Sequence, residues 1–222
     1  MGDIHNMIIE KGSKLIMIGD SITDASRAQP AGEGLFGALG QGYVPQIDAL
    51  IGAAYDGAYP IRIINKGLSG NTVRDLKNRW QTDVLDLKPD WVSIMIGAND
   101  VWRQFDLPLQ TDWHVLIDEY ESTLEELVKQ TRPVVKGLIL MTPFYMEPNR
   151  NDQMRAAIDR YGDVVKRLAK HNDAVLVDTQ AAMDKVLQNY YSATLGWDRI
   201  HPTQTGYMII ARAFLNAIGF EW

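Results

Sequence analysis

The sequence contains a serine in a setting that suits acyl transfer. Ser21 follows an apolar run at residues 15–18 and is preceded directly by Gly19 and Asp20. A serine hydroxyl becomes a useful nucleophile only beside a general base and an oxyanion stabiliser. Gly19 permits a tight turn, and a helix beginning after it would aim backbone N–H groups at an anion. A Gly-Asp-Ser tripeptide is more often a plain helix cap after a strand, so its chemistry depends on partners elsewhere in the chain.

Among the four histidines, His201 has the setting that a general base needs. His5 lies in the N-terminal segment, His114 on a predicted helix and His171 near the end of another predicted helix. His201 lies in a predicted loop and precedes Pro202, which biases it towards extended backbone. His201 is therefore the candidate base.

Asp198 is the candidate partner of this imidazole because it precedes His201 by three residues. A turn across that spacing brings a carboxylate to the Nδ1–H group, which fixes the tautomer, leaves Nε2 free and stabilises an imidazolium. Asp178, at the end of the fifth predicted strand, is the alternative acid. If Asp198 and His201 stood alone, a helix cap and a surface histidine would be the better explanation. Their expected position at the same sheet edge as Ser21 favours chemistry.

Two further loops contain candidate oxyanion donors. Gly70 follows the second predicted strand and Asn99 follows the third. The backbone N–H groups of Gly70 and Ser21, with the Asn99 side-chain amide, would form an oxyanion hole. Taken separately, these residues favour structural explanations, namely turn conformation for Gly70 and satisfaction of loop backbone for Asn99 or Asp100. Only their common location favours catalysis.

These side chains require a sheet to position them, and five short apolar runs predict one. Each run ends abruptly in polar or turn-forming residues, and continuous rather than alternating apolar runs are typical of parallel strands buried on both faces. Ligands of such sheets bind beyond the carboxyl ends of the strands. The runs comprise residues 15–18, 61–64, 91–96, 138–141 and 174–177.

Three stretches between and after these runs repeat apolar residues at helical spacing. The first is expected to begin at a cap provided by Asp112, and the last to stop at Gly219. Strands that alternate with helices imply right-handed βαβ units and an α/β domain of three layers. The apolar residues of each stretch form a stripe along one face of the predicted helix. The three stripes are Leu116, Tyr120, Leu124 and Leu127; Met154, Ala157, Ile158, Tyr161, Val165 and Leu168; and Tyr207, Ile210, Ala211, Phe214, Leu215 and Ile218.

Composition restricts the class of protein. The chain has 222 residues, 46% of them hydrophobic, and a net charge of −6. This length predicts a single domain over residues 1–222. The absence of cysteine removes thiol chemistry and thiolate metal sites, and no histidine or carboxylate cluster has ligand spacing, so we expect no metal and no other cofactor.

The acidic balance argues against nucleic acid as a partner, and no apolar run approaches the roughly 20 residues of a membrane span. The polar N-terminus lacks a signal-peptide core, which favours a cytoplasmic protein. Apolar helices that contain Tyr, Trp and Met are compatible with a homo-oligomer and equally with core packing.

The motifs occur in the order of the four blocks of the SGNH, or GDSL-type, hydrolases, and the chain resembles that family. The blocks are Gly19-Asp20-Ser21, Gly70, Gly97-Ala98-Asn99-Asp100 and Asp198 to Pro202. Residues 65–80, 88–104, 135–145, 197–202, 211–215 and 218–222 are similar to the family's intracellular acetylxylan esterases.

The resemblance implies a flavodoxin-like α/β/α fold with five parallel strands. It implies that Ser21 is the nucleophile, that His201 is the base oriented by Asp198, and that Ser21, Gly70 and Asn99 form the oxyanion hole. Many members have glycine shortly after the serine, where this chain has Thr23 and Asp24, a departure that concerns the local turn and the acyl pocket.

The function that follows is hydrolysis of a small-molecule ester through an acyl-enzyme, with acetyl groups on xylo-oligosaccharides as the expected substrate. Asp20, Trp102 and Trp197 are candidate substrate contacts, since aromatic faces suit sugar rings, although core or rim packing explains the tryptophans equally well. The alternatives are a thioesterase or lysophospholipase of the same family, and a flavodoxin-like module that binds a flavin phosphate without catalysis.

A dinucleotide fingerprint also occurs, at residues 32–37, with the spacing Gly-x-Gly-x-x-Gly. It follows no predicted strand, and Gly40 and Gly42 make an immediate helix improbable. The segment is expected to be a glycine-rich loop at the pocket rim or at a subunit contact.

Overall fold

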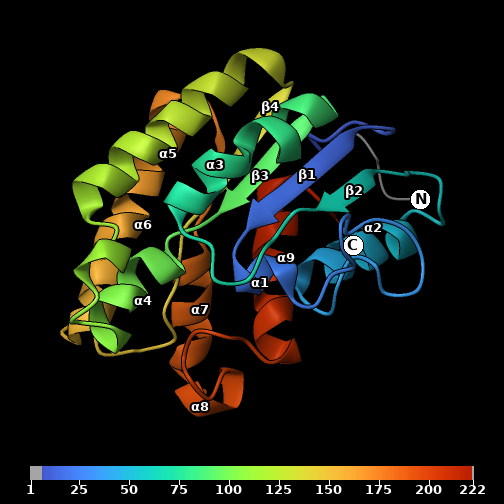
Figure 1. The fold of residues 1–222 in the computed structure, drawn as a ribbon. Helices are drawn as coiled ribbons and strands as arrows, with labels where there is room; N and C mark the ends of the chain where they lie inside the picture. The colour runs from blue at the N-terminus through green and yellow to red at the C-terminus, as the bar shows by residue number, and fades with distance from the viewer. Residues whose placement is uncertain (1–6, 222) are drawn as a thin grey trace.

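Five parallel strands form one sheet in the computed structural model, which describes residues 7–221 (Figure 1). The strands are β1 (Lys14–Gly19), β2 (Arg62–Asn65), β3 (Trp91–Met95), β4 (Gly137–Met141) and β5 (Val175–Val177). Their order is β2-β1-β3-β4-β5, which is the flavodoxin-like doubly wound order. The topological switch point therefore lies between β1 and β3, and ligands are expected beyond the carboxyl ends of these two strands.

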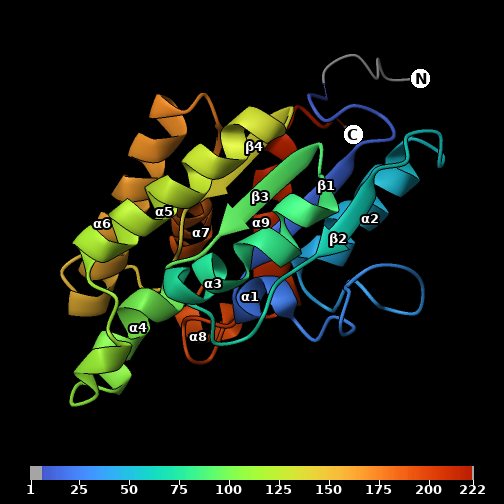
Figure 2. The same cartoon turned by 45° about the horizontal axis from the view of Figure 1, so that its top comes forward.

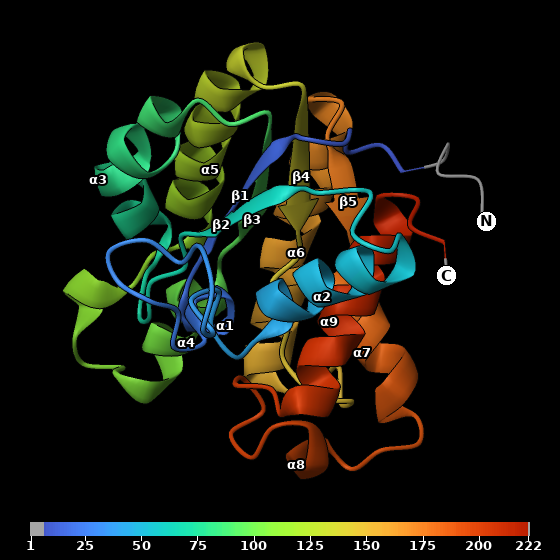
Figure 3. The ribbon, with the colours of Figure 1, turned by 90° about the vertical axis from the view of Figure 1, so that its right-hand side faces the viewer.

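Helices cover both faces of the sheet. Figure 3 shows α3 and α5 on one side and α2, α7 and α9 on the other. The view in Figure 2 shows α6 beside α5, and α6 also contacts β4 and β5. None of the helices within residues 7–221 has the length and apolar character that a membrane crossing requires.

The helical elements, in chain order, are α1 (Ser21–Asp24), α2 (Tyr43–Ala54), α3 (Val73–Asp83), η2 (Leu85–Leu87), α4 (Ala98–Asp106), η3 (Thr111–Trp113), α5 (Ile117–Thr131), η4 (Arg132–Val134), α6 (Gln153–His171), α7 (Thr179–Leu187), α8 (Ser192–Leu195) and α9 (Gln204–Ala217).

The centre of the sheet is the centre of the core. Every residue of β3 and β4 is buried, whereas the edge strand β5 has its middle residue, Leu176, 37% exposed. Gly19 at the end of β1 pairs in register with Met95 at the end of β3. The segments after these two strands, which contain Ser21 and Asn99, therefore begin side by side at one edge of the sheet.

The predicted fold class is confirmed. All five apolar runs form strands, and the bounds of each strand lie within one residue of those predicted. In the fifth run, Ala174 lies outside the strand. The stripe from Met154 to Leu168 lies buried on α6, and α9 stops before Gly219, which has φ +76°.

The predicted start of the helix over residues 116–127 is wrong. Asp112 belongs to η3, and α5 begins only at Ile117, after Leu116, which is exposed and provides no side-chain cap. The guanidinium of Arg74 binds the backbone carbonyls of Asp112 and His114, and this tertiary contact holds the segment outside the helix.

The glycine-rich segment at residues 32–37 crosses the end of β2. Gly32 forms an isolated antiparallel bridge with Asn65, and Glu33 pairs with Arg62. The next helix, α2, begins only at Tyr43, so no helix N-terminus directly follows the fingerprint.

Candidate active site

Ser21 is the first residue of α1 and lies just beyond the end of β1. Asp20 caps this short helix, because its Oδ1 accepts a hydrogen bond of 3.0 Å from the backbone N–H of Ile22. The serine hydroxyl is therefore not needed as a cap. Burial raises the pKa of Asp20 to about 6, although the bond from Ile22 and the proximity of His201 act in the opposite direction.

The structure brings Ser21, His201 and Asp198 together although the serine and the histidine are 180 residues apart in sequence. Ser21 Oγ lies 2.9 Å from His201 Nε2, and His201 Nδ1 lies 2.6 Å from Asp198 Oδ2. The other carboxylate oxygen of Asp198 accepts hydrogen bonds from the backbone N–H groups of Ile200 and His201. Although burial opposes ionisation, these three bonds from His201 and the backbone hold the pKa of Asp198 below its usual value. The carboxylate is thus charged and fixed against the imidazole.

The alternative acid and the other histidines have different surroundings from Asp198 and His201. Asp178 accepts a hydrogen bond from the N–H of Ala181 as the cap of α7 and pairs with Lys166. His171 ends α6, as expected. His114 lies between η3 and α5 rather than on a helix, with Nε2 at 2.9 Å from the carbonyl oxygen of Leu107, so that prediction is wrong. His5 lies outside the described residues.

Three N–H groups at the carboxyl edge have the properties of oxyanion donors. Gly70 has φ +83°, a conformation that favours glycine, and within residues 7–221 nothing accepts its backbone N–H. The backbone N–H of Ser21, in the first turn of α1, also has no acceptor there. Asn99 is 3% exposed and donates from Nδ2 to the carbonyl oxygen of Asn71 at 3.0 Å. One Nδ2 proton of Asn99 is used in this contact and the second is available.

Asp24, which departs from the family pattern, connects the serine turn to the Gly70 loop. Its Oδ2 accepts hydrogen bonds from the backbone N–H of Ser69 at 3.0 Å and from the Ser69 hydroxyl at 2.7 Å. Thr23 beside it is fully buried, with its hydroxyl 3.0 Å from that of Tyr43. The turn also packs closely against Gly67, where a Cβ atom would lie 2.1 Å from the backbone nitrogen of Asp24.

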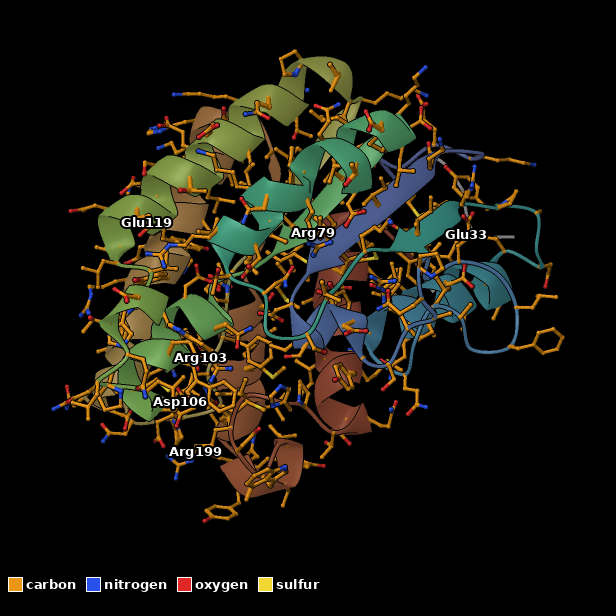
Figure 4. All side chains as sticks on the ribbon, viewed as in Figure 1. Glu33, Arg79, Arg103, Asp106, Glu119 and Arg199 are labelled. Atoms are coloured by element: carbon orange, nitrogen blue, oxygen red, sulfur yellow. The ribbon has the colours of Figure 1, made fainter. Side chains whose placement is uncertain are left out.

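Two further residues that sequence analysis missed fix the same loops. Asn65 is fully buried and donates from Nδ2 to the carbonyl oxygens of Thr23 and Leu39. Arg79, labelled in Figure 4 on α3, donates to the carbonyl oxygen of Gly19 and to Oδ1 of Asn71. The residues on either side of the candidate nucleophile and of Gly70 are therefore held by hydrogen bonds.

Asp100 is a buried carboxyl that joins α3 to α4. Its Oδ1 accepts a 2.9 Å hydrogen bond from the N–H of Val73, the first residue of α3. Its Oδ2 is buried without a partner among the described residues. Burial raises the pKa of Asp100 to about 7; the bond from Val73 lowers it, and the charge of Asp20 adds to the rise.

The three candidate substrate contacts have different positions. Trp102 packs its ring edge-on against the imidazole of His201, with centroids 5.8 Å apart, and is partly buried. Trp197 is 84% exposed beside Asp198. Asp20 is only 2% exposed and caps α1, which gives it a structural position beneath the serine rather than one that faces a substrate.

Within residues 7–221, no three histidine or acidic side chains gather as they would around a metal ion.

A doubly wound α/β fold that presents a hydrogen-bonded serine, histidine and aspartate at the carboxyl edge of its sheet defines the class of serine hydrolases. Residues 17–209 match the GDSL-like lipase/acylhydrolase family, and the chain belongs to that family.

Similar proteins extend this comparison over nearly the whole chain. An acetylxylan esterase from Geobacillus stearothermophilus is 60% identical over 216 residues, which are 97% of this chain and 98% of that one. The crystal structure of that organism's acetylxylan esterase Axe2 matches with a TM-score of 0.96 over 97% of this chain and 98% of that one, at 60% identity. LAE5, described as an alpha/beta hydrolase from the metagenome of Lake Arreo, matches with a TM-score of 0.94 at 56% identity, over 96% of this chain and 98% of that one.

Three other solved structures of Axe2 are described as catalytic mutants, in which a serine, an aspartate or a histidine is replaced by alanine. The aspartate and the histidine replaced in them are three residues apart in that protein.

Proposed function

We propose that this chain is a serine esterase that removes acetyl groups from xylo-oligosaccharides through an acyl-enzyme. The observation that carries the proposal is the chain of hydrogen bonds from Ser21 Oγ through the imidazole of His201 to Asp198, at 2.9 and 2.6 Å. The chain is 60% identical, over 97% of its length, to the acetylxylan esterase of Geobacillus stearothermophilus, and this similarity supports the choice of substrate.

In the first step, Ser21 Oγ attacks the ester carbonyl carbon while His201 Nε2 takes the hydroxyl proton. The carbonyl oxygen becomes an oxyanion, which the N–H groups of Ser21 and Gly70 and the amide of Asn99 stabilise. Each such donor contributes roughly 10²–10³ in rate. The bond from the acyl carbon to the sugar oxygen then breaks. The imidazolium gives its proton to that oxygen, which leaves as the sugar hydroxyl.

In the second step, His201 takes a proton from water, whose oxygen attacks the acetyl group on Ser21. Acetate leaves, and the proton returns from His201 to the serine oxygen. Asp198 stays ionised, holds the Nδ1–H tautomer and stabilises the imidazolium in both steps. The side chains and the ester complete this chemistry, so the proposed mechanism requires no metal or other cofactor.

The spacing in the Axe2 mutants supports these roles. The aspartate and the histidine replaced there as catalytic lie three residues apart, as Asp198 and His201 do here. We therefore assign Asp198 rather than Asp178 as the acid of the proposed triad.

Replacement of the nucleophile and a series of acyl chains test the proposal together. With p-nitrophenyl acetate, Ser21→Ala should lower kcat by at least about 10³-fold, because the attacking oxygen is gone. The wild-type enzyme should have a higher kcat/KM for the acetate than for the octanoate ester, and should release acetate from acetylated xylo-oligosaccharides.

The matched control is Ser122→Ala, which removes an exposed serine hydroxyl from α5 and should retain wild-type turnover. Undiminished turnover by Ser21→Ala would refute the assignment of the nucleophile. A preference for octanoate would favour a thioesterase or lysophospholipase. A purified protein that contained flavin and lacked esterase activity would favour the binding module.

A further inference from the structure

A groove whose lining residues are mostly polar in type lies beside Gly70 and the start of α3. It has a volume of about 480 Å³, and its walls come from the Gly70 loop, α3, α4 and η3. This volume lies in the range of small-molecule sites and far exceeds the needs of the methyl group of an acetyl ester. The groove adjoins the candidate active site through Gly70, a proposed oxyanion donor, and through Arg103, which is bonded to Asn99.

Trp113 forms an exposed aromatic wall of this groove. It is the last residue of η3, and 61% of it is accessible to solvent. An aromatic ring exposed in the wall of a groove offers a flat apolar face to a ligand. The ring does not belong to the hydrophobic core, since it lies outside the cluster of buried apolar residues.

The backbone on both sides of Trp113 is fixed by one guanidinium. Arg74 donates to the carbonyl oxygen of Asp112 at 2.7 Å and to that of His114 at 2.9 Å. Arg74 is itself held by two hydrogen bonds to Glu119, which Figure 4 labels at the start of α5. A tryptophan on a backbone fixed in this way loses little entropy when it binds a ligand.

Other residues that line the groove provide polar groups that can form hydrogen bonds with hydroxyls. Asn78 is exposed on α3, and its side chain makes no hydrogen bond with the described residues. Arg103 lines the groove from α4 and donates from Nη2 to Oδ1 of Asn99 at 3.4 Å. Asp75 contributes a further carboxylate. These charges and amides are unfavourable surroundings for an alkyl chain and favourable ones for a polyol.

We propose that this groove binds the sugar chain of the substrate, with a xylopyranose ring stacked on Trp113 and its hydroxyls hydrogen-bonded to Asn78 and Arg103. The proposal rests on the proposed function, because it assigns the leaving alcohol of that same reaction. A xylopyranose ring carries no exocyclic carbon, so its C–H groups can lie flat on the negative face of an indole. The bond from Arg103 to Asn99 connects this sugar subsite to a proposed oxyanion donor.

The test compares kcat/KM for acetylated xylotriose with kcat/KM for p-nitrophenyl acetate, whose small leaving group cannot span the groove. Trp113→Ala should lower the ratio of these two values by about 10-fold, mainly through KM for the sugar ester. Trp113→Phe should retain part of the ratio. Asn78→Trp, which adds bulk to the lining of the groove, should lower the ratio without removing Trp113.

Inhibition provides a second measurement that does not depend on hydrolysis of a sugar ester. Xylotriose should inhibit hydrolysis of p-nitrophenyl acetate by the wild-type enzyme, and its inhibition constant should rise about 10-fold in Trp113→Ala. The matched control is Phe36→Ala, which truncates another fully exposed aromatic side chain, outside the groove, and should change neither value.

The outcomes separate the two proposals. If wild-type enzyme hydrolyses neither ester, the proposed function is wrong. If it hydrolyses both, and Trp113→Ala and Asn78→Trp keep the wild-type ratio and inhibition constant, the sugar subsite is wrong while the esterase stands. A selective loss of octanoate hydrolysis in Asn78→Trp would instead assign the groove to the acyl chain and overturn the proposal.

Discussion

Asp24 links the two loops that the proposed acylation step requires. It lies three residues after Ser21, and its carboxylate holds both the backbone N–H and the hydroxyl of Ser69, next to Gly70. A donor stabilises an oxyanion only when it is held in place before the charge develops. We therefore interpret Asp24 as a positioning residue for the Gly70 N–H group.

Replacing Asp24 by alanine should lower kcat for p-nitrophenyl acetate by about 10–100-fold, with little change in KM. The physical reason is that the Gly70 loop loses two hydrogen bonds and one oxyanion donor is no longer fixed. Steady-state kinetics of both parameters provide the measurement, with circular dichroism to verify folding.

Two variants control for a merely structural effect of Asp24. Asp24→Asn keeps an acceptor for Ser69 and should recover part of kcat. Ser69→Ala removes only the hydroxyl bond and should have the smaller loss. A folded Asp24→Ala enzyme with wild-type kcat would show that the loop needs no such support.

Single residues differ in how far the sequence predicts their neighbours. Asp198 and His201 are three residues apart, so a local turn suffices to predict their contact, and the 2.6 Å distance agrees with it. The partner of Asp24 is 45 residues away and that of Arg79 at Gly19 is 60 residues away. No local pattern specifies such pairs; the departure at Thr23 and Asp24 was the one signal, and it marked the position without its partner.

At the scale of elements, Asp100 connects the start of α3 to α4 through the N–H of Val73. The carboxyl is fully buried, and its second oxygen has no partner among the described residues. Burial raises its pKa from 3.8 to about 7, so the neutral form is favoured in the folded protein.

Asp100→Asn should therefore stabilise the protein relative to wild type as the pH rises. A raised carboxyl pKa contributes stability that is fully present below the unfolded value, near 4, and is lost as pH rises through the folded value, near 7. Asparagine keeps the acceptor for Val73 and cannot ionise. The difference in free energy of unfolding between variant and wild type should grow in favour of the variant by on the order of 1–4 kcal/mol from pH 4.5 to pH 8.

Urea denaturation at several pH values measures this difference. Asp20 is present in both proteins and its charge contributes to the pKa of Asp100, so the measured difference includes the coupling between the two carboxyls. A difference that stayed constant across this pH range would contradict a neutral, buried Asp100.

The sequence predicts a helix or a strand correctly where the pattern of buried apolar residues alone determines its position. The strands and the stripe of α6 follow from continuous or periodic apolar residues, and the structure confirms them. The start of α5 was not predicted correctly, because Arg74, from a different helix, holds the carbonyls of Asp112 and His114. The tertiary hydrogen bonds from Arg74 override the local preference for a helix cap at Asp112.

For the molecule as a whole, burial is concentrated in the middle of the sheet. Ile94 in β3 is 2% exposed and lies between two paired strands, whereas Leu176 in the edge strand β5 is 37% exposed. Loss of side-chain volume costs most where the surroundings cannot collapse into the space.

Ile94→Ala should lower the free energy of unfolding by about 2–5 kcal/mol, and Leu176→Ala by at most about 1 kcal/mol. Chemical denaturation with an unchanged m-value measures both. Equal losses at the two positions would mean that the edge strand is packed as tightly as the centre.

The sequence by itself predicted the layers of this protein and the family it resembles, and it indicated Ser21, His201 and Asp198 as candidate catalytic residues, with Asp178 as the alternative acid. Apolar periodicity and local spacing carry that information, because both act over a few residues along the chain. The comparisons confirm the family, and the strand order confirms the doubly wound topology.

Only the tertiary structure decided which groups surround those three side chains. In the structure Asp178 caps α7 instead of contacting the imidazole, Asp24 and Arg79 bind the loops of the candidate site, and Trp113 lies beside the groove at Gly70. The contacts of Asp24, Arg79 and the Trp113 segment join residues that are far apart in the sequence. For Asp178, the structure selects one of several possible partners. The geometry of these contacts is set by the packing of the whole sheet with its helices, which local sequence does not encode.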